Sequence, residues 1–78
     1  MAINKDEIVK VIVGDVPALQ NIGEEDFDTT FDELGVDSLD RSTMFLDLEE
    51  AYGVEFTDED IENYDTINRI VEVINKSA

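Results

Sequence analysis

One amphipathic segment organises the chain: DSLDRSTMFLDLEEAY, residues 37–52. Asp37 is a good helix N-cap, Ser38 falls at the first helical position, and the helix should run to about Ala51. Apolar side chains recur along it at helical spacing, which predicts one face that packs on a core. That face carries Met44, Phe45, Leu48 and Tyr52.

The opposite face of the same helix has a second stripe. Its members stand at i, i+4, i+7 and i+11 and point away from the core-facing side chains. They are Leu39, Thr43, Leu46 and Glu50. Two leucines on a solvent-facing stripe make a small apolar patch, and nearby carboxylates give it an acidic rim. We expect this patch to dock on a partner that offers basic residues around an apolar depression.

Before this helix, the sequence predicts an N-terminal helix and a long connection. The N-terminal helix begins after the cap Asn4 and ends near residue 15 or 16, because Pro17 disfavours helical angles in the residue before it. The connection has no clean period, and a structureless loop of about 20 residues is unusual in a small domain. We therefore expect a short helical turn in it, with Phe27 and Phe31 turned into the core and Gly35 allowing the chain to reverse.

After it, two more helices are predicted. Thr57 caps a short one of about two turns with an acidic first turn, and a last helix begins at residue 65 or 66. The inward side chains of the flanking helices are Ile8, Val9, Ile12, Val13, Ile61, Tyr64, Ile67, Ile70, Val71 and Ile74. Four helical segments without a convincing strand predict an all-α four-helix bundle, three helices longer and one short, formed by residues 1–78 as a single domain.

The composition excludes several classes of function. The 78 residues include 21 Asp and Glu against 5 Lys and Arg, a net charge of −16, with no His and no Cys. No Ser-His-Asp or Cys-His nucleophile, disulfide or soft-metal site can form without those residues. A domain this small also has little room for a catalytic cleft. We expect no catalytic residue, no dedicated metal site and no enzyme activity.

The negative charge is concentrated in the middle of the chain. Between Glu24 and Asp65 there are 17 acidic residues and one basic residue, Arg41. Such a charge opposes binding to nucleic acid and to anionic membranes. No apolar run approaches the ~20 residues that span a bilayer, and no signal peptide is visible. We expect a cytoplasmic monomer that binds basic protein surfaces and neither binds nucleic acid nor inserts into a membrane.

The stretch LGVDSLD, residues 34–40, resembles the attachment motif of the acyl carrier protein family, an Asp-Ser-Leu triplet that opens a helix after a Leu-Gly pair. Leu48-Glu49-Glu50 with Tyr52, the short acidic third helix and the apolar last helix also match. The resemblance implies that Ser38 carries a 4′-phosphopantetheine arm, added from coenzyme A by a separate phosphopantetheinyl transferase. The terminal thiol of that arm would hold an acyl group as a thioester.

The resemblance also implies which surface meets partners. Carriers of this family present this helix to basic patches on enzymes of fatty-acid, polyketide or lipid biosynthesis. On this chain the partner-binding residues would be Asp37, Leu39, Asp40, Thr43, Leu46, Glu49 and Glu50. Arg41, Ser42 and Thr43 depart from the pattern of fatty-acid carriers, which points to a specialised member. A long acyl chain would be sheltered by inward side chains such as Phe45, Leu48, Ile61 and Ile70.

Two alternatives come from other classes of protein, both of them acidic helical interaction proteins without a prosthetic group. A cation-binding protein would need an EF-hand loop, and the stretches that begin at Asp26 and Asp58 lack the glycine at the sixth position. An inhibitor that mimics nucleic acid fits the charge, but it gives no reason for the Asp-Ser-Leu triplet.

Overall fold

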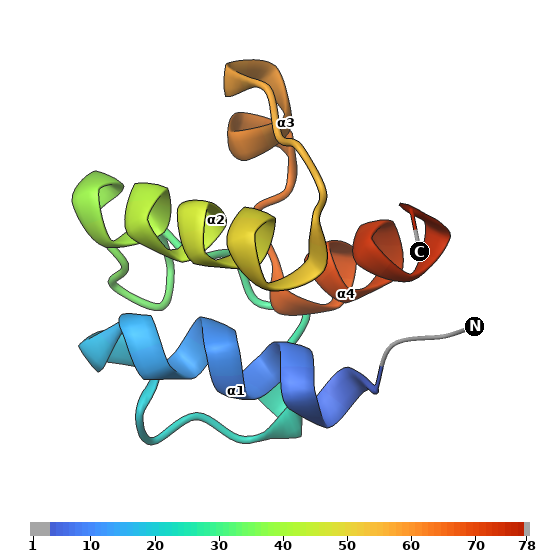
Figure 1. Cartoon of the computed structure of the whole chain (residues 1–78). Coiled ribbons are helices and arrows are strands. Elements are labelled where there is room, and N and C mark those ends of the chain that lie inside the picture. The colour runs from blue at the N-terminus through green and yellow to red at the C-terminus, as the bar shows by residue number, and fades with distance from the viewer. Residues whose placement is uncertain (1–3, 78) are drawn as a thin grey trace.

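The computed structural model describes residues 4–77 and shows four α-helices joined by loops (Figure 1). The helices are α1 (Lys5–Asp15), α2 (Ser38–Tyr52), α3 (Asp58–Asn63) and α4 (Ile67–Ser77), and two 3₁₀ turns lie at Pro17–Leu19 and Glu24–Asp26. No strand occurs within residues 4–77. The all-α prediction is confirmed, with three longer helices and a short α3. None of these helices combines the length and the apolar character needed to cross a bilayer.

Local signals at both ends of α2 explain its extent. The Asp37 carboxylate accepts a hydrogen bond from the Asp40 N–H at 2.8 Å, which satisfies one free amide of the first turn. At the other end Gly53 adopts a left-handed conformation with φ of 67°, and its N–H donates to the Glu49 carbonyl. The helix therefore begins where the sequence predicts and ends one residue later than expected.

The caps of α1 and α3 follow the same logic. Asn4 accepts a hydrogen bond from the Asp6 N–H at 2.8 Å, as expected for the N-cap of α1. Thr57 and Asp60 form a reciprocal capping box, in which each side chain accepts a hydrogen bond from the other residue's N–H at 3.0 Å. Residues 58–63 thereby form a helix of only six residues.

The connection between α1 and α2 is held down by its own aromatic residues. Phe27 and Phe31 are buried, as predicted, although they follow the second 3₁₀ turn instead of sharing one turn. The Phe31 N–H donates to the Asp65 carbonyl at 2.9 Å, and the Phe27 carbonyl accepts from the Asn68 N–H at 3.1 Å. These bonds attach the connection to the start of α4. Gly35, with φ of 82°, then reverses the chain toward α2.

The core lies between α1, α2, α4 and the connection, and α1 and α2 run in opposite directions (Figure 1). The buried side chains are Ile8, Ile12, Val16, Leu19, Phe27, Phe31, Val36, Met44, Phe45, Leu48, Ile67, Ile70, Val71 and Ile74. Other predicted inward residues pack against this core while only partly buried: Val9, Val13, Tyr52, Ile61 and Tyr64. No residue of α3 is fully buried, so α3 lies outside the main core.

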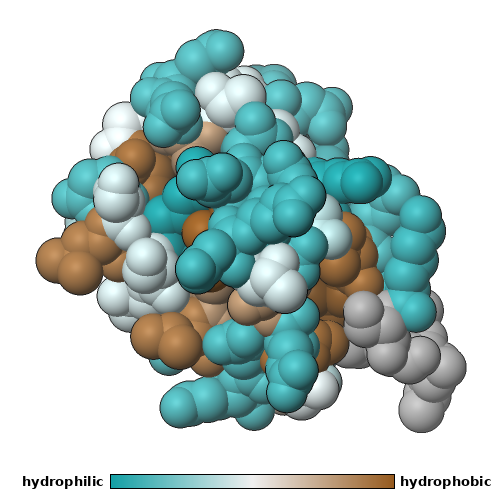
Figure 2. Space-filling model, turned by 90° about the horizontal axis from the view of Figure 1, so that it is seen from above, coloured by the Kyte–Doolittle hydropathy of each residue, from teal (hydrophilic) through white to brown (hydrophobic). Residues whose placement is uncertain are grey.

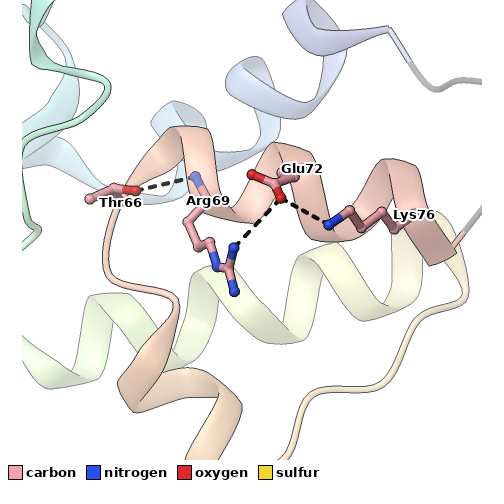
Figure 3. Close-up of polar contacts among 4 residues, drawn as sticks. All are labelled: Thr66, Arg69, Glu72 and Lys76. Carbon is pink, nitrogen blue, oxygen red and sulfur yellow. Dashed lines mark hydrogen bonds and ion pairs between the residues drawn. The ribbon is translucent and has the colours of Figure 1, made fainter.

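A row of polar side-chain contacts runs along the exposed face of α4 (Figure 3). Thr66 accepts a hydrogen bond from the Arg69 N–H at 3.2 Å, and Glu72 pairs with Arg69 at 3.6 Å and with Lys76 at 3.0 Å. The hydrogen bond from Lys76 and the charges of Lys76 and Arg69 hold the pKa of Glu72 below its ordinary value. These groups are well exposed, so the pairs contribute little to stability.

Candidate functional site

Ser38 is the first residue of α2 and is exposed to solvent. Its hydroxyl has no hydrogen-bond partner among the residues that the structure describes, because Asp37 supplies the cap instead. The backbone just before it is fixed: Val36 is buried, and its N–H donates to the Phe31 carbonyl at 2.9 Å. An accessible hydroxyl is thus presented from a rigid base, as a covalent attachment point requires.

The electrostatic surroundings of Ser38 act in two directions. Free N–H groups and the positive end of the helix dipole favour an anion at the first turn of α2. Asp37 is exposed beside the hydroxyl and Asp40 lies in the same turn, and both carboxylates repel an anion. A phosphate ester on Ser38 would therefore be tolerated without being held against the protein surface.

The outer face of α2 presents the predicted apolar stripe. The side chains of Leu39 and Leu46 are 75% and 60% exposed, and they are the exposed large apolar residues of the described chain. Thr43 and Glu50, which complete the stripe, are exposed as well, and the Thr43 hydroxyl donates to the Leu39 carbonyl at 3.1 Å. Figure 2 shows apolar surface at the left edge, on the side where α2 begins in Figure 1.

Two of the residues predicted to bind partners are less available than the stripe. The Glu49 carboxylate is partly buried and accepts a hydrogen bond from the Phe56 N–H at 2.8 Å, so it fixes the loop that leads to α3. Asp40 is partly buried in the first turn of α2. Asp37 and Glu50 remain as the exposed acidic residues on the two ends of the stripe.

Arg41 has a structural role that its place in the sequence did not indicate. Its guanidinium donates to the carbonyls of Ile61 and Glu62, at 2.6 and 3.2 Å, and lies 5.5 Å from the centre of the Phe31 ring. It thereby joins α2 to the end of α3 and to the connection. The one hint in the sequence was that Arg41 is the sole base in an acidic stretch of 17 carboxylates.

A small surface pocket lies beside Ser38. Its volume is about 150 Å³, and it is lined by Ser38, Arg41, Ser42, Ile61 and Glu62. The pocket is therefore formed where α2 meets α3, next to the Ser38 hydroxyl. Among the predicted sheltering residues only Ile61 lines it, while Phe45, Leu48 and Ile70 are fully buried in the core.

Comparison with protein families supplies the last observation. The family model described as "phosphopantetheine attachment site" matches residues 7–74, which include all four helices apart from the outermost residues of α1 and α4. Carrier domains of this family are generally non-catalytic, are modified by a phosphopantetheinyl transferase and interact with acyl-processing enzymes. The group they carry is a covalently attached 4′-phosphopantetheine. The helical fold and this match together place the chain in the phosphopantetheine-binding family of carrier proteins.

Proposed function

We propose that this protein carries acyl groups as thioesters on a 4′-phosphopantetheine arm attached to Ser38, and presents them to enzymes of fatty-acid, polyketide or lipid biosynthesis. One observation carries the proposal. The serine of the Asp-Ser-Leu triplet stands exposed at the first position of α2, and its hydroxyl is unengaged within residues 4–77. The arm would supply a terminal thiol, which this chain, having no Cys, does not have.

The surroundings of Ser38 suit an arm that swings. Asp37 and Asp40 repel the phosphate, and the one cation nearby, Arg41, already donates to two carbonyls of α3. The guanidinium of Arg41 is therefore directed toward α3 through its Nη2 atom, which disfavours a clamp on the arm. A tethered group that remains mobile can reach several partner enzymes in turn.

The chain has no means to load itself. Deprotonating a serine hydroxyl needs a nearby base, and a carboxylate is a weak base for an alcohol. The sequence contains no His. The transferase must therefore supply the base, while this protein supplies an accessible hydroxyl and a surface on which the transferase docks.

We place that docking surface on the outer face of α2. It comprises Asp37, Leu39, Thr43, Leu46 and Glu50, with Asp40 and Glu49 contributing charge from partly buried positions. The exposed leucines would enter an apolar depression, and the acidic rim would attract Lys and Arg on the partner. The proposal includes a single carrier domain that acts as a monomer in the cytoplasm, where coenzyme A is the donor of the arm.

Two observations bear on the alternative of an acidic interaction protein without a prosthetic group. Within the described residues, no group of three or more carboxylates is placed to hold a metal ion. The family match covers 7–74, and a nucleic-acid mimic gives no reason for it.

Mass spectrometry tests the proposal directly. The purified protein, incubated with coenzyme A and a broadly tolerant phosphopantetheinyl transferase, should gain the mass of one phosphopantetheine unit. Ser38→Ala should gain none. Ser42→Ala is the matched control, because it removes a serine hydroxyl one turn further along α2 that lines the same pocket. This variant should be loaded normally. An unmodified wild-type protein, or a loaded Ser38→Ala variant, would refute the assignment.

A further inference from the structure

The residues expected to shelter a long acyl chain cannot be reached from the attachment site in this structure. Phe45, Leu48 and Ile70 are almost completely buried, and none of them lines the pocket beside Ser38. A chain that entered the pocket would reach them only if α3 moved away from α2. The contacts between these two helices therefore decide how much cargo the domain can enclose.

Arg41 is the polar link between the two helices. In residues 4–77, the hydrogen bonds that join the side chains of α2 to α3 itself are the two from the Arg41 guanidinium to the carbonyls of Ile61 and Glu62. The 2.6 Å bond is short and charge-assisted, and carbonyls at the end of a helix are its natural acceptors. Packing within α3 is limited, because none of its six residues is fully buried, although Ile61 packs against the core. The flanking residues Phe56 and Tyr64 also pack against the core, so Arg41 adds a polar link to a helix whose two ends are already anchored.

The volume of the pocket sets the length of acyl chain that the domain can enclose while Arg41 holds α3 against α2. A protein cavity of about 150 Å³ takes a ligand the size of benzene, on the order of six non-hydrogen atoms, and the pocket has a volume of about 150 Å³. A longer chain needs more room than this, and that room is closed while Arg41 holds α3.

We propose that Arg41 is a specificity-determining residue that latches α3 onto α2, so that the domain shelters short acyl chains of about six carbons and leaves longer chains in solvent. This inference rests on the proposed acyl carriage by Ser38. It assigns the chain-length limit to one side chain, whose donors can be removed while its apolar stem is kept.

The test compares acyl lengths on wild-type protein and on Arg41→Met, which keeps the stem and loses the donors. Both proteins are loaded from butyryl-, hexanoyl- and dodecanoyl-coenzyme A and examined by NMR. In wild type, the short chains should shift the amide signals of Ser42, Ile61 and Glu62, and the dodecanoyl chain should leave the methyl signals of Leu48 and Ile70 unmoved. In Arg41→Met, the dodecanoyl chain should shift those methyl signals, and its thioester should hydrolyse about tenfold more slowly than in wild type, because a sheltered thioester is less accessible to water.

A second readout uses the protein without cargo. Loss of hydrogen bonds to a charged group should raise the opening equilibrium of α3 by about tenfold or more, which hydrogen exchange at the Ile61 and Tyr64 amides would report. Lys76→Met is the matched control, because it removes the same charge from α4. The polar partner of Lys76 among the described residues is the exposed Glu72, and this variant should behave as wild type. Arg41→Lys keeps the charge, and its hydrogen-exchange rates should lie between those of wild type and Arg41→Met. This variant provides the test if Arg41→Met folds poorly.

The outcomes separate this inference from the proposed function. If no variant is loaded at all, the proposed function fails and the latch fails with it. If loading is normal, two results would overturn the latch alone: wild-type protein taking the dodecanoyl chain to Leu48 and Ile70, or Arg41→Met and wild type sheltering every chain equally.

Discussion

Asp15 at the end of α1 and Asp47 in the middle of α2 form a carboxyl pair whose effect on stability can be worked out. The pKa of Asp15 is raised from 3.8 to about 6, first by a side-chain hydrogen bond with Asp47, then by burial and by the negative charge of Asp47. The Asp15 Oδ2 atom is buried and finds no N–H or O–H donor among the described residues. A proton shared with Asp47 is what can satisfy it.

The sign follows from the direction of the shift. A carboxyl group whose pKa is higher in the folded than in the unfolded chain holds its proton more tightly when folded. The stabilisation by the protonated pair is complete below about pH 3.8 and is lost as the pH rises through about 6. A pKa rise of this size corresponds to at most about 3 kcal/mol. Because Asp15 is partly exposed, solvent screening reduces the effect to about 1–2 kcal/mol.

Asp47→Asn should therefore stabilise the protein. An amide at position 47 donates a hydrogen bond to the Asp15 carboxylate and removes the repulsion. We expect the free energy of unfolding to rise by about 1–2 kcal/mol at pH 7, and the melting temperature to rise by about 5–15 °C. The gain should fall by about half at pH 5, because wild-type Asp15 is then largely protonated.

Denaturant unfolding followed by circular dichroism between pH 5 and pH 8 measures this difference. Glu50→Gln is the matched control, since it removes one negative charge from the same helix at an exposed position. It should change stability by less than about 0.5 kcal/mol, as surface substitutions usually do. An equal gain from both variants at every pH would show that general charge relief, and not the Asp15–Asp47 pair, is responsible; no gain from Asp47→Asn would refute the reasoning outright.

Two further predictions concern docking and the end of α2. Leu46→Ala should weaken binding to the transferase by about fivefold or more, and Glu50→Lys should mainly slow association. The control Glu24→Lys, in the connection, should do neither. If all three variants had equal effects in surface plasmon resonance, the docking face would lie elsewhere. Gly53→Ala should lower the free energy of unfolding by about 1–2 kcal/mol, because φ is 67° at this residue although there is space for a methyl group. Gly14→Ala, inside α1 and with equal space, should instead raise the free energy of unfolding by about 0.5–1 kcal/mol. Changes of the same sign for both variants in thermal melts would contradict the conformational argument.

Much of the fold was predictable because its signals are local. The caps Asn4, Asp37 and Thr57 mark three helix starts within a few residues of their effects. The opposite faces of α2 also follow from spacing alone, so the exposure of Leu39 and Leu46 agrees with the prediction. Periodicity places a side chain on a face whatever the rest of the chain does, and this is why these predictions hold.

The interactions that were missed depend on segments far apart in the sequence. Arg41 and the carbonyls it binds are about 20 residues apart, and no local pattern says that the end of α3 will come to rest above it. Glu49 looked like a rim residue because charge at a helix surface is usually solvated, yet its carboxylate holds the Phe56 N–H. The partner of Asp15 could not be read from the sequence either, since it depends on how α1 crosses α2.

Two of these missed contacts involve side chains on the flanks of α2, between its buried side and its exposed side. The helix has one side in the core and one exposed side, which we propose faces partners. Arg41 and Asp47 lie on its remaining flanks, partly buried against α3 and α1 respectively. On these flanks a polar side chain decides how firmly a neighbouring helix is held. Arg41 tightens the contact with α3, whereas the repulsion between the Asp15 and Asp47 carboxyl groups loosens the contact with α1 at neutral pH. Substitutions at these two positions should therefore alter the opening of the domain without altering Ser38 or the docking stripe.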